Sequence, residues 1–136
     1  IGGGMAIGQA FQATELSDAL GTALAPLASW PRLVMIFSLC LFATFLTELT
    51  SNTAVANIMM PIMVAVGVAA DIDPRLVMIP VTLGLNWSFM LPVATAPNAI
   101  LFSTGRVTTA TMAREGFALN LIGAVVITAT CYVLLS

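Results

Sequence analysis

The sequence predicts an all-α integral membrane protein that contains a re-entrant helical hairpin and a broken transmembrane helix. The chain is 60% hydrophobic and 7% charged, whereas soluble domains carry about 25% charged residues. Uncharged runs cover 49–70, 76–105 and 116–136, and each is long enough to enter or cross a bilayer. A polar cluster from Thr47 to Thr53 interrupts the apolar stretch 33–70 near its centre. Together these features exclude a soluble domain.

The first 30 residues predict two elements. Residues 1–14 are small and apolar, which is typical of the end of a transmembrane helix. The chain begins with Ile1 and lacks the charged start and cleavage site of a signal peptide, so we expect a fragment of a longer chain. Residues 15–30 carry leucines at helical spacing beside two acidic residues, which predicts an amphipathic helix at the membrane interface.

The stretch 33–70 predicts the hairpin. As one helix it would be about 57 Å long, while a bilayer core is only about 30 Å thick. The chain must therefore fold back, and the polar cluster marks the turn. The arms 33–48 and 54–70 are each about 16 residues long, shorter than the roughly 20 of a full crossing, which favours a re-entrant hairpin. Two tightly joined, tilted spanning helices are the alternative.

The run 76–105 predicts a membrane helix that is broken in its middle. Asp73 and Pro74, just before the run, are typical of a helix start. Pro92 and Pro97 remove backbone donors and clash with the preceding turn, so we expect an unwound link near 93–98.

The remainder is simpler. Residues 106–115 hold two arginines and predict a polar loop, and residues 116–136 predict a last, plain transmembrane helix.

Two unwound polar segments therefore lie at membrane depth: Ser51 to Thr53 at the hairpin tip, and Thr95 to Asn98 in the broken helix. Non-helical backbone, whose N–H and C=O groups are unpaired, is tolerated at this depth only against protein or around a polar cavity. Free carbonyls, hydroxyls and amides are hard oxygen ligands that suit Na⁺, while helix N-termini attract anions. Secondary transporters combine these features near the bilayer midplane. The chain has no histidine and only two, widely separated cysteines, so we expect no transition metal.

Two segments resemble a known family. Residues 45–54, FLTELTSNTA, with Pro61 after them, resemble the second Ser-Asn-Thr hairpin of the divalent anion:sodium symporter (DASS) family, the sodium-dicarboxylate/sulfate symporters. Residues 83–100 are similar to that family's second signature region, although Ala96 stands where the family commonly has a proline. The resemblance implies the C-terminal half, one inverted repeat, of an inverted-repeat elevator-type transporter.

The resemblance also implies the site residues. It assigns substrate binding to five positions: Ser51, Asn52, Thr53, Thr95 and Ala96. It assigns sodium binding to an overlapping set: Thr50, Ser51, Asn52, Ala94, Thr95, Ala96 and Asn98.

The function that the resemblance implies is sodium-coupled symport of di- or tricarboxylates such as succinate, with Na⁺ as coupling ion and no other cofactor. A carrier of sulfate or another inorganic anion on the same scaffold is the alternative. Expected partners are the anion, Na⁺, the lipid bilayer, the N-terminal repeat of the same protein and a second copy in a homodimer. The expected location is the bacterial inner (plasma) membrane, with the hairpin ends outside and the 106–115 loop in the cytoplasm.

Other classes fit less well. A channel with re-entrant loops favours a polar stripe along its spanning helices, and 116–136 shows almost none. An enzyme needs a nucleophile with a base, and the chain has no His or Lys to serve Ser51. With four arginines and no basic stripe, a nucleic-acid partner is not expected. A truncated remnant that does not transport stays open.

Glu48 is the one charge in the hairpin stretch. A carboxylate at membrane depth is functional by default, as an ion ligand or a proton-titrating coupler. We favour a structural role, in which Glu48 accepts hydrogen bonds from backbone near the tip or from an arginine elsewhere.

Overall fold

The computed structural model describes residues 29–135 continuously, and before them only Ala6, Gln9, Ala10, Ala13, Thr14, Glu15, Ala19, Thr22, Ala23 and Pro26. The elements expected at 1–14 and 15–30 therefore lie largely outside the described residues. The continuous part contains five helices and no strand, which confirms the predicted all-α fold. The helices are α3 (Arg32–Leu49), α4 (Asn52–Ala69), α5 (Arg75–Leu85), α6 (Ala96–Ser103) and α7 (Thr109–Leu135).

Three of the described helices are long and apolar enough to cross a membrane: α3, α4 and α7. The 18-residue windows that meet this criterion have mean hydropathies of 1.8, 1.6 and 2.1. α3 and α4 have 18 residues each, about 27 Å of helix, while the 27 residues of α7 make about 40 Å. The chain is an integral membrane protein.

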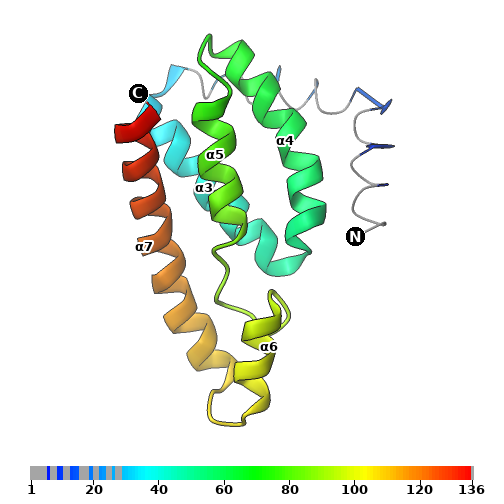
Figure 1. The fold of residues 1–136 in the computed structure, drawn as a ribbon, viewed down its shortest axis with the longest axis vertical. Helices are drawn as coiled ribbons and strands as arrows, with labels where there is room; N and C mark the ends of the chain where they lie inside the picture. The colour runs from blue at the N-terminus through cyan, green and yellow to red at the C-terminus, as the bar shows by residue number, and fades with distance from the viewer. Residues whose placement is uncertain are drawn as a thin grey trace.

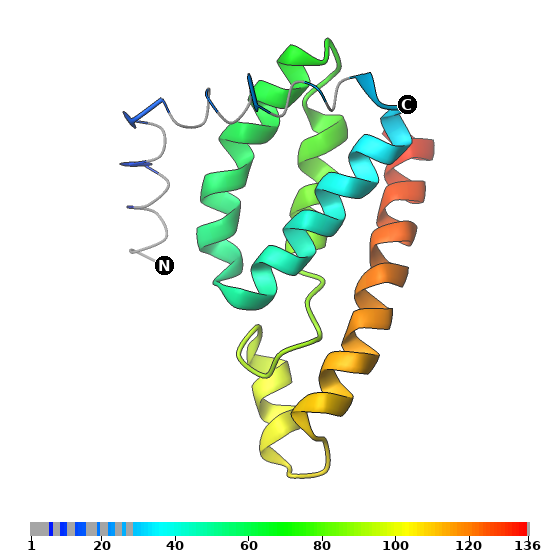
Figure 2. The ribbon, with the colours of Figure 1, turned by 180° about the vertical axis from the view of Figure 1, so that it is seen from behind.

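The α3–α4 hairpin turns within two residues. α3 ends at Leu49, Thr50 and Ser51 are extended, and α4 begins at Asn52. The outer ends of both helices lie at the end of the molecule where α7 finishes, and the tip stops part-way along α7 (Figures 1 and 2). The chain thus reverses at the predicted polar cluster, next to the start of α6.

A tight turn joins α4 to α5. The N–H of Ile72 donates to the Gly67 carbonyl and the N–H of Asp71 to the Val68 carbonyl, while Asp71 takes a left-handed φ of 53°. These two hydrogen bonds give partners to carbonyl groups that have none within the helix at its C-terminal end. A Cβ on Gly67 would lie 2.7 Å from the Pro74 Cα, so the close approach requires glycine. The Asp73 carboxylate then accepts the Arg75 N–H at 2.9 Å and starts α5.

The helix of 76–105 is broken, but earlier than the sequence indicates. α5 ends at Leu85, the chain is not helical over 86–95, and α6 begins at Ala96. Pro97 lies in the first turn of α6. A backbone N–H at this position would have no partner within the helix, so proline costs no hydrogen bond there. It therefore marks a helix start rather than the unwound segment.

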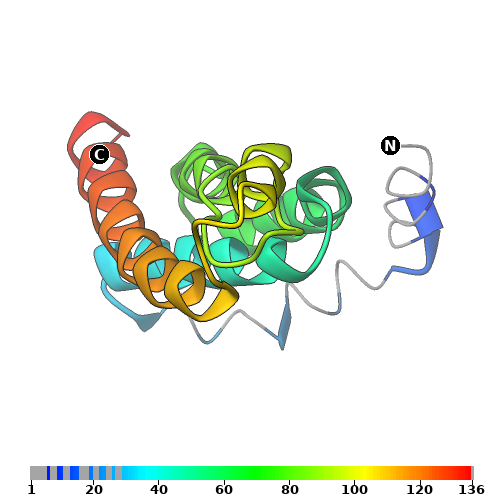
Figure 3. The ribbon, with the colours of Figure 1, turned by 90° about the horizontal axis from the view of Figure 1, so that it is seen from below.

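The arms of the hairpin splay apart, and α5 packs against both. The main core is formed by buried residues of α3, α4 and α5, among them Met35, Met63 and Val81. A smaller cluster joins α3 to α7 and includes the free, buried Cys40 and Cys131. Seen from below, α7 and α4 lie on opposite sides, with α5 and α6 between them (Figure 3).

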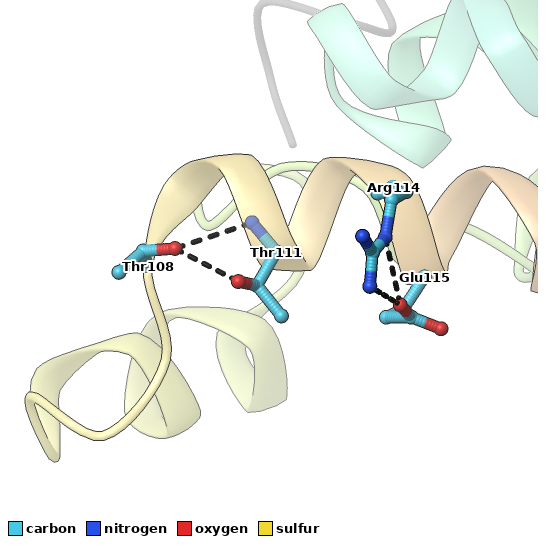
Figure 4. A network of polar contacts seen from close by, with 4 residues as sticks. All are labelled: Thr108, Thr111, Arg114 and Glu115. Atoms are coloured by element: carbon cyan, nitrogen blue, oxygen red, sulfur yellow. Dashed lines mark hydrogen bonds and ion pairs between the residues drawn. The ribbon is translucent and has the colours of Figure 1, made fainter.

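α7 begins earlier than predicted. The Thr108 hydroxyl accepts the Thr111 N–H at 3.2 Å and shares a 2.9 Å bond with the Thr111 hydroxyl, which caps the helix (Figure 4). Arg114 and Glu115 then form an exposed ion pair of 2.7 Å on the helix surface. Most of the predicted 106–115 loop is therefore helical, because a threonine cap and paired charges support the first turns of α7.

Candidate functional site

The hairpin tip and the unwound link face each other across a pocket of about 510 Å³. The tip contributes Leu49, Thr50, Ser51 and Asn52, and the link contributes Val93, Ala94, Thr95 and Ala96. The two stretches are more than forty positions apart in sequence, as the numbering shows, and each one runs directly into a helix. The pocket is therefore formed where α4 and α6 both begin.

On the tip side, the start of α4 has no side-chain cap. Ser51 occupies the N-cap position in an extended conformation, yet its side chain makes no capping hydrogen bond. The first-turn N–H groups of a helix have no partner within the helix, so those of α4 are left open beside the pocket. The Asn52 side-chain oxygen accepts a hydrogen bond from the Thr47 hydroxyl in the last turns of α3. This bond ties the two sides of the tip together.

On the link side, Thr95 caps α6. Its hydroxyl accepts the Asn98 N–H at 3.4 Å. The buried Asn98 amide donates to the carbonyls of Ser88 and Leu91, both at 3.0 Å. Asn98 therefore gives partners to carbonyls that the broken helix cannot pair, and it holds the link against the first turn of α6.

Glu48 lies behind the pocket and connects both walls. Its side chain is 4% exposed. One carboxylate oxygen accepts the Met90 N–H at 3.0 Å and the Asn120 amide at 2.7 Å, and the other accepts the Leu91 N–H at 3.1 Å. The structural role favoured for Glu48 from the sequence matches this geometry, although the backbone that it bonds belongs to the link rather than to the tip.

α7 supports the link through two glycines. A Cβ on Gly116 would lie 2.4 Å from the Phe89 carbonyl oxygen, and one on Gly123 would lie 2.0 Å from the Trp87 ring nitrogen. The same ring nitrogen donates to the Leu119 carbonyl at 2.9 Å. The link thus lies directly on the surface of α7.

The structure brings together six of the residues assigned from the sequence: Thr50, Ser51, Asn52, Ala94, Thr95 and Ala96 all line the pocket. Thr53 is exposed in the first turn of α4 and is not among the lining residues. Asn98 is buried behind the pocket, where its amide donates to the two link carbonyls.

Sequence reasoning missed three residues of the site. Leu49 lines the pocket, and Thr47 and Asn120 act behind it through the bonds described above. Val93, which also lines the pocket, lies at the start of the link expected at 93–98. A signal for Asn120 exists: it is an amide at helical spacing between Gly116 and Gly123 in an otherwise apolar helix.

Among the residues that the structure describes, no charged side chain lines the pocket, and all four arginines are exposed. Within the described residues there is no group of His, Cys, Asp or Glu side chains that could hold a metal ion. What the pocket offers is hydroxyls, amides, backbone carbonyls and two helix N-termini. Such groups suit an anion at the helix starts and a hard monovalent cation among the oxygens.

Comparison with known proteins places this geometry in context. Residues 1–134 match a family model described as the sodium:sulfate symporter transmembrane region. The chain is 40% identical over 133 residues to the sodium-dependent dicarboxylate transporter SdcS of Staphylococcus saprophyticus, covering 98% of the chain and 26% of that protein. It is 43% identical over 127 residues to solute carrier family 13 member 2 of Homo sapiens, covering 93% of the chain and 22% of that protein. It is 37% identical over 123 residues to the Na(+)/dicarboxylate cotransporter 3 of Mus musculus, covering 90% of the chain and 20% of that protein.

Proposed function

The chain belongs to the sodium:sulfate symporter family, and on that premise we propose that it takes part in sodium-coupled symport of di- or tricarboxylates such as succinate. The family resemblance seen in the sequence is thereby confirmed, and the family is one of transporters rather than enzymes. The chain spans about a quarter of the length of these relatives. The complete carrier would add the N-terminal repeat, and we propose that it forms a homodimer.

The observation that carries the proposal is that two helices begin at one pocket. A helix N-terminus carries about +0.5 of an elementary charge, so α4 and α6 together offer about +1. A dicarboxylate carries about two negative charges at neutral pH, because carboxyl groups ionise near pH 4. Since no arginine or lysine lines the pocket, bound Na⁺ is the natural source of the missing positive charge.

The two kinds of ligand would share the same residues. The uncapped first turn of α4 and the Ser51 hydroxyl can donate to a carboxylate. The carbonyl oxygen of the extended residue Thr50 can face a cation, whereas the Thr95 carbonyl accepts the Ala99 N–H at 3.1 Å. Binding of Na⁺ would order the tip and complete the anion site, which couples the two events.

Carboxylates are favoured over sulfate by the relatives. Those whose names state an organic substrate, SdcS and cotransporter 3, are named for dicarboxylates. Sulfate remains the second candidate substrate because the description of the matching family model names sulfate.

The hairpin is proposed to be re-entrant. Its tip stops part-way along α7 and adjoins the helix break, where a span of unpaired backbone needs protein around it. By family analogy the hairpin and link would carry the pocket across the membrane as one elevator-type unit.

Uptake into proteoliposomes tests the proposal. The complete protein should take up radiolabelled succinate in an inward Na⁺ gradient and lose uptake when choline replaces Na⁺; citrate and sulfate complete the panel. Asn52→Ala should abolish uptake with membrane insertion intact, whereas Asn86→Ala, the same change at an exposed residue outside the pocket, should not. Uptake that persists in choline would contradict sodium coupling, and preferred uptake of sulfate would select the second candidate.

A further inference from the structure

We propose that Glu48 is a positioning residue that fixes the hairpin tip and the unwound link in one geometry, and so sets the affinity of the sodium site without touching the ion. This inference rests on the proposed function. It concerns a residue that lies outside the pocket and would act through backbone atoms of the pocket walls.

The carboxylate joins two parts of the chain that lie more than forty positions apart in sequence. Glu48 lies in the last turn of α3, two positions before Thr50. The N–H groups that it accepts belong to Met90 and Leu91, just before the pocket residues 93–96. One side chain therefore sets the distance between the two walls of the pocket.

α7 completes this arrangement. Asn120 is fully buried and donates its amide to Glu48 at 2.7 Å, while its own side-chain oxygen has no protein partner in the described residues. An amide buried in an apolar helix is costly unless it is bonded, so the bond to Glu48 accounts for a polar residue at this position. The glycines one turn to either side let the link lie close enough for the same carboxylate to reach both partners.

The position of Glu48 argues against direct contact with the ion. The side chain is not among the pocket-lining residues. Both of its oxygens already accept hydrogen bonds, three in all. Loss of the carboxylate would leave two link N–H groups without partners, and the link would be free to shift.

Three variants of the complete transporter separate positioning from charge. Glu48→Gln keeps the shape but turns one acceptor into a donor, and Glu48→Asp keeps the charge but is one methylene too short to reach all three donors. We expect both to raise the Na⁺ concentration for half-maximal uptake by about 10- to 100-fold, the range typical of residues that orient metal ligands. Glu115→Gln, the same change at an exposed residue, should leave that concentration unchanged.

The results have distinct meanings. A folding defect alone lowers the maximal uptake rate but leaves the Na⁺ dependence of the folded fraction unaltered, so a shift in that dependence supports positioning. The Hill coefficient for Na⁺ should stay at its wild-type value. A lower Hill coefficient would mean that Glu48 binds the ion directly. A Glu48→Asp variant with wild-type Na⁺ dependence would mean that only the charge of Glu48 matters. Either result would overturn the proposal.

A second readout does not depend on transport. Val93 is 82% exposed on the link, so Val93→Cys reports on the link through its rate of alkylation, with Cys40 and Cys131 buried. Adding Glu48→Gln should change this rate several-fold in purified protein, whereas adding Glu115→Gln should not. An equal rate in all three proteins would refute the positioning role, and failure of wild-type uptake alone would refute only the proposed function.

Discussion

The Thr47 hydroxyl donates to the side-chain oxygen of Asn52 across the two-residue tip that separates α3 from α4. Thr47 is fully buried, so the bond anchors a pocket residue to the protein interior. It also orients the Asn52 amide, whose NH₂ group is left to donate. A carboxylate is a suitable acceptor for this donor, because hydrogen bonds to an ionised acceptor are stronger than those to a neutral one.

This orientation predicts a loss of substrate affinity in Thr47→Val, which is close to threonine in shape but has no hydroxyl. A hydrogen bond of this kind contributes about 0.5–1.5 kcal/mol, so the apparent KM for succinate should rise roughly 2- to 10-fold. Thr47→Ser retains the hydroxyl and serves as the control. Equal KM values for the valine and serine variants would show that the bond has no part in binding.

Gly116 provides a test of how the link is supported. Gly116→Ala places a Cβ against the backbone of Phe89 and Met90. Backbone cannot move aside as easily as the end of a flexible side chain can. Overpacking of this kind costs about 1–3 kcal/mol, so the thermal unfolding midpoint in detergent should fall. Ala118→Val, a larger addition on the exposed face of the same helix, should have little effect. An unchanged midpoint for Gly116→Ala would mean that the link does not lie on α7 as described.

Thr95 should matter as a cap as well as a pocket residue. Thr95→Ala removes the acceptor of the Asn98 N–H, which typically costs about 1 kcal/mol. Thr95→Ser keeps the oxygen and should restore most of both stability and uptake, measured by thermal unfolding and by succinate transport. If serine fails to restore either quantity, the threonine methyl group rather than the cap is responsible.

The depth of the tip can be measured by cysteine labelling from each side of the membrane. Ala110→Cys, near the start of α7, should react with an impermeant reagent only from the cytoplasm. Thr50→Cys at the tip should be resistant to a bulky impermeant reagent from that side, because a re-entrant tip stops within the protein. Rapid cytoplasmic labelling of both positions would instead indicate two fully spanning helices.

Local sequence patterns were sufficient for the hairpin. Caps and polar residues act over a few positions, so the turn at 50–51 and the start of α5 beside Asp73 follow from neighbouring residues. The cap by Thr108 was not predicted, and the start of α7 was expected too late in the chain. Pro61 and Pro80 show the limit of such patterns, because both lie inside helices.

The extent of the unwound link could not be predicted locally. Helix is lost from residue 86 because the backbone there finds side-chain partners outside its own helix. Glu48, more than forty positions away, accepts two of its N–H groups, and Asn98 in α6 donates to two of its carbonyls. The same contacts place Asn98 behind the pocket and bring in Asn120, which no spacing rule connects to Glu48.

The central claim is that the pocket between tip and link holds Na⁺ and a dicarboxylate together, and Ala94 allows it to be measured directly. Ala94→Cys lies in the pocket wall, and its alkylation rate can be followed without salt, with Na⁺, with succinate and with both. The account predicts that Na⁺ and succinate together slow alkylation several-fold, and that succinate without Na⁺ gives little protection. The same rate under all four conditions, in a variant that still transports, would contradict it.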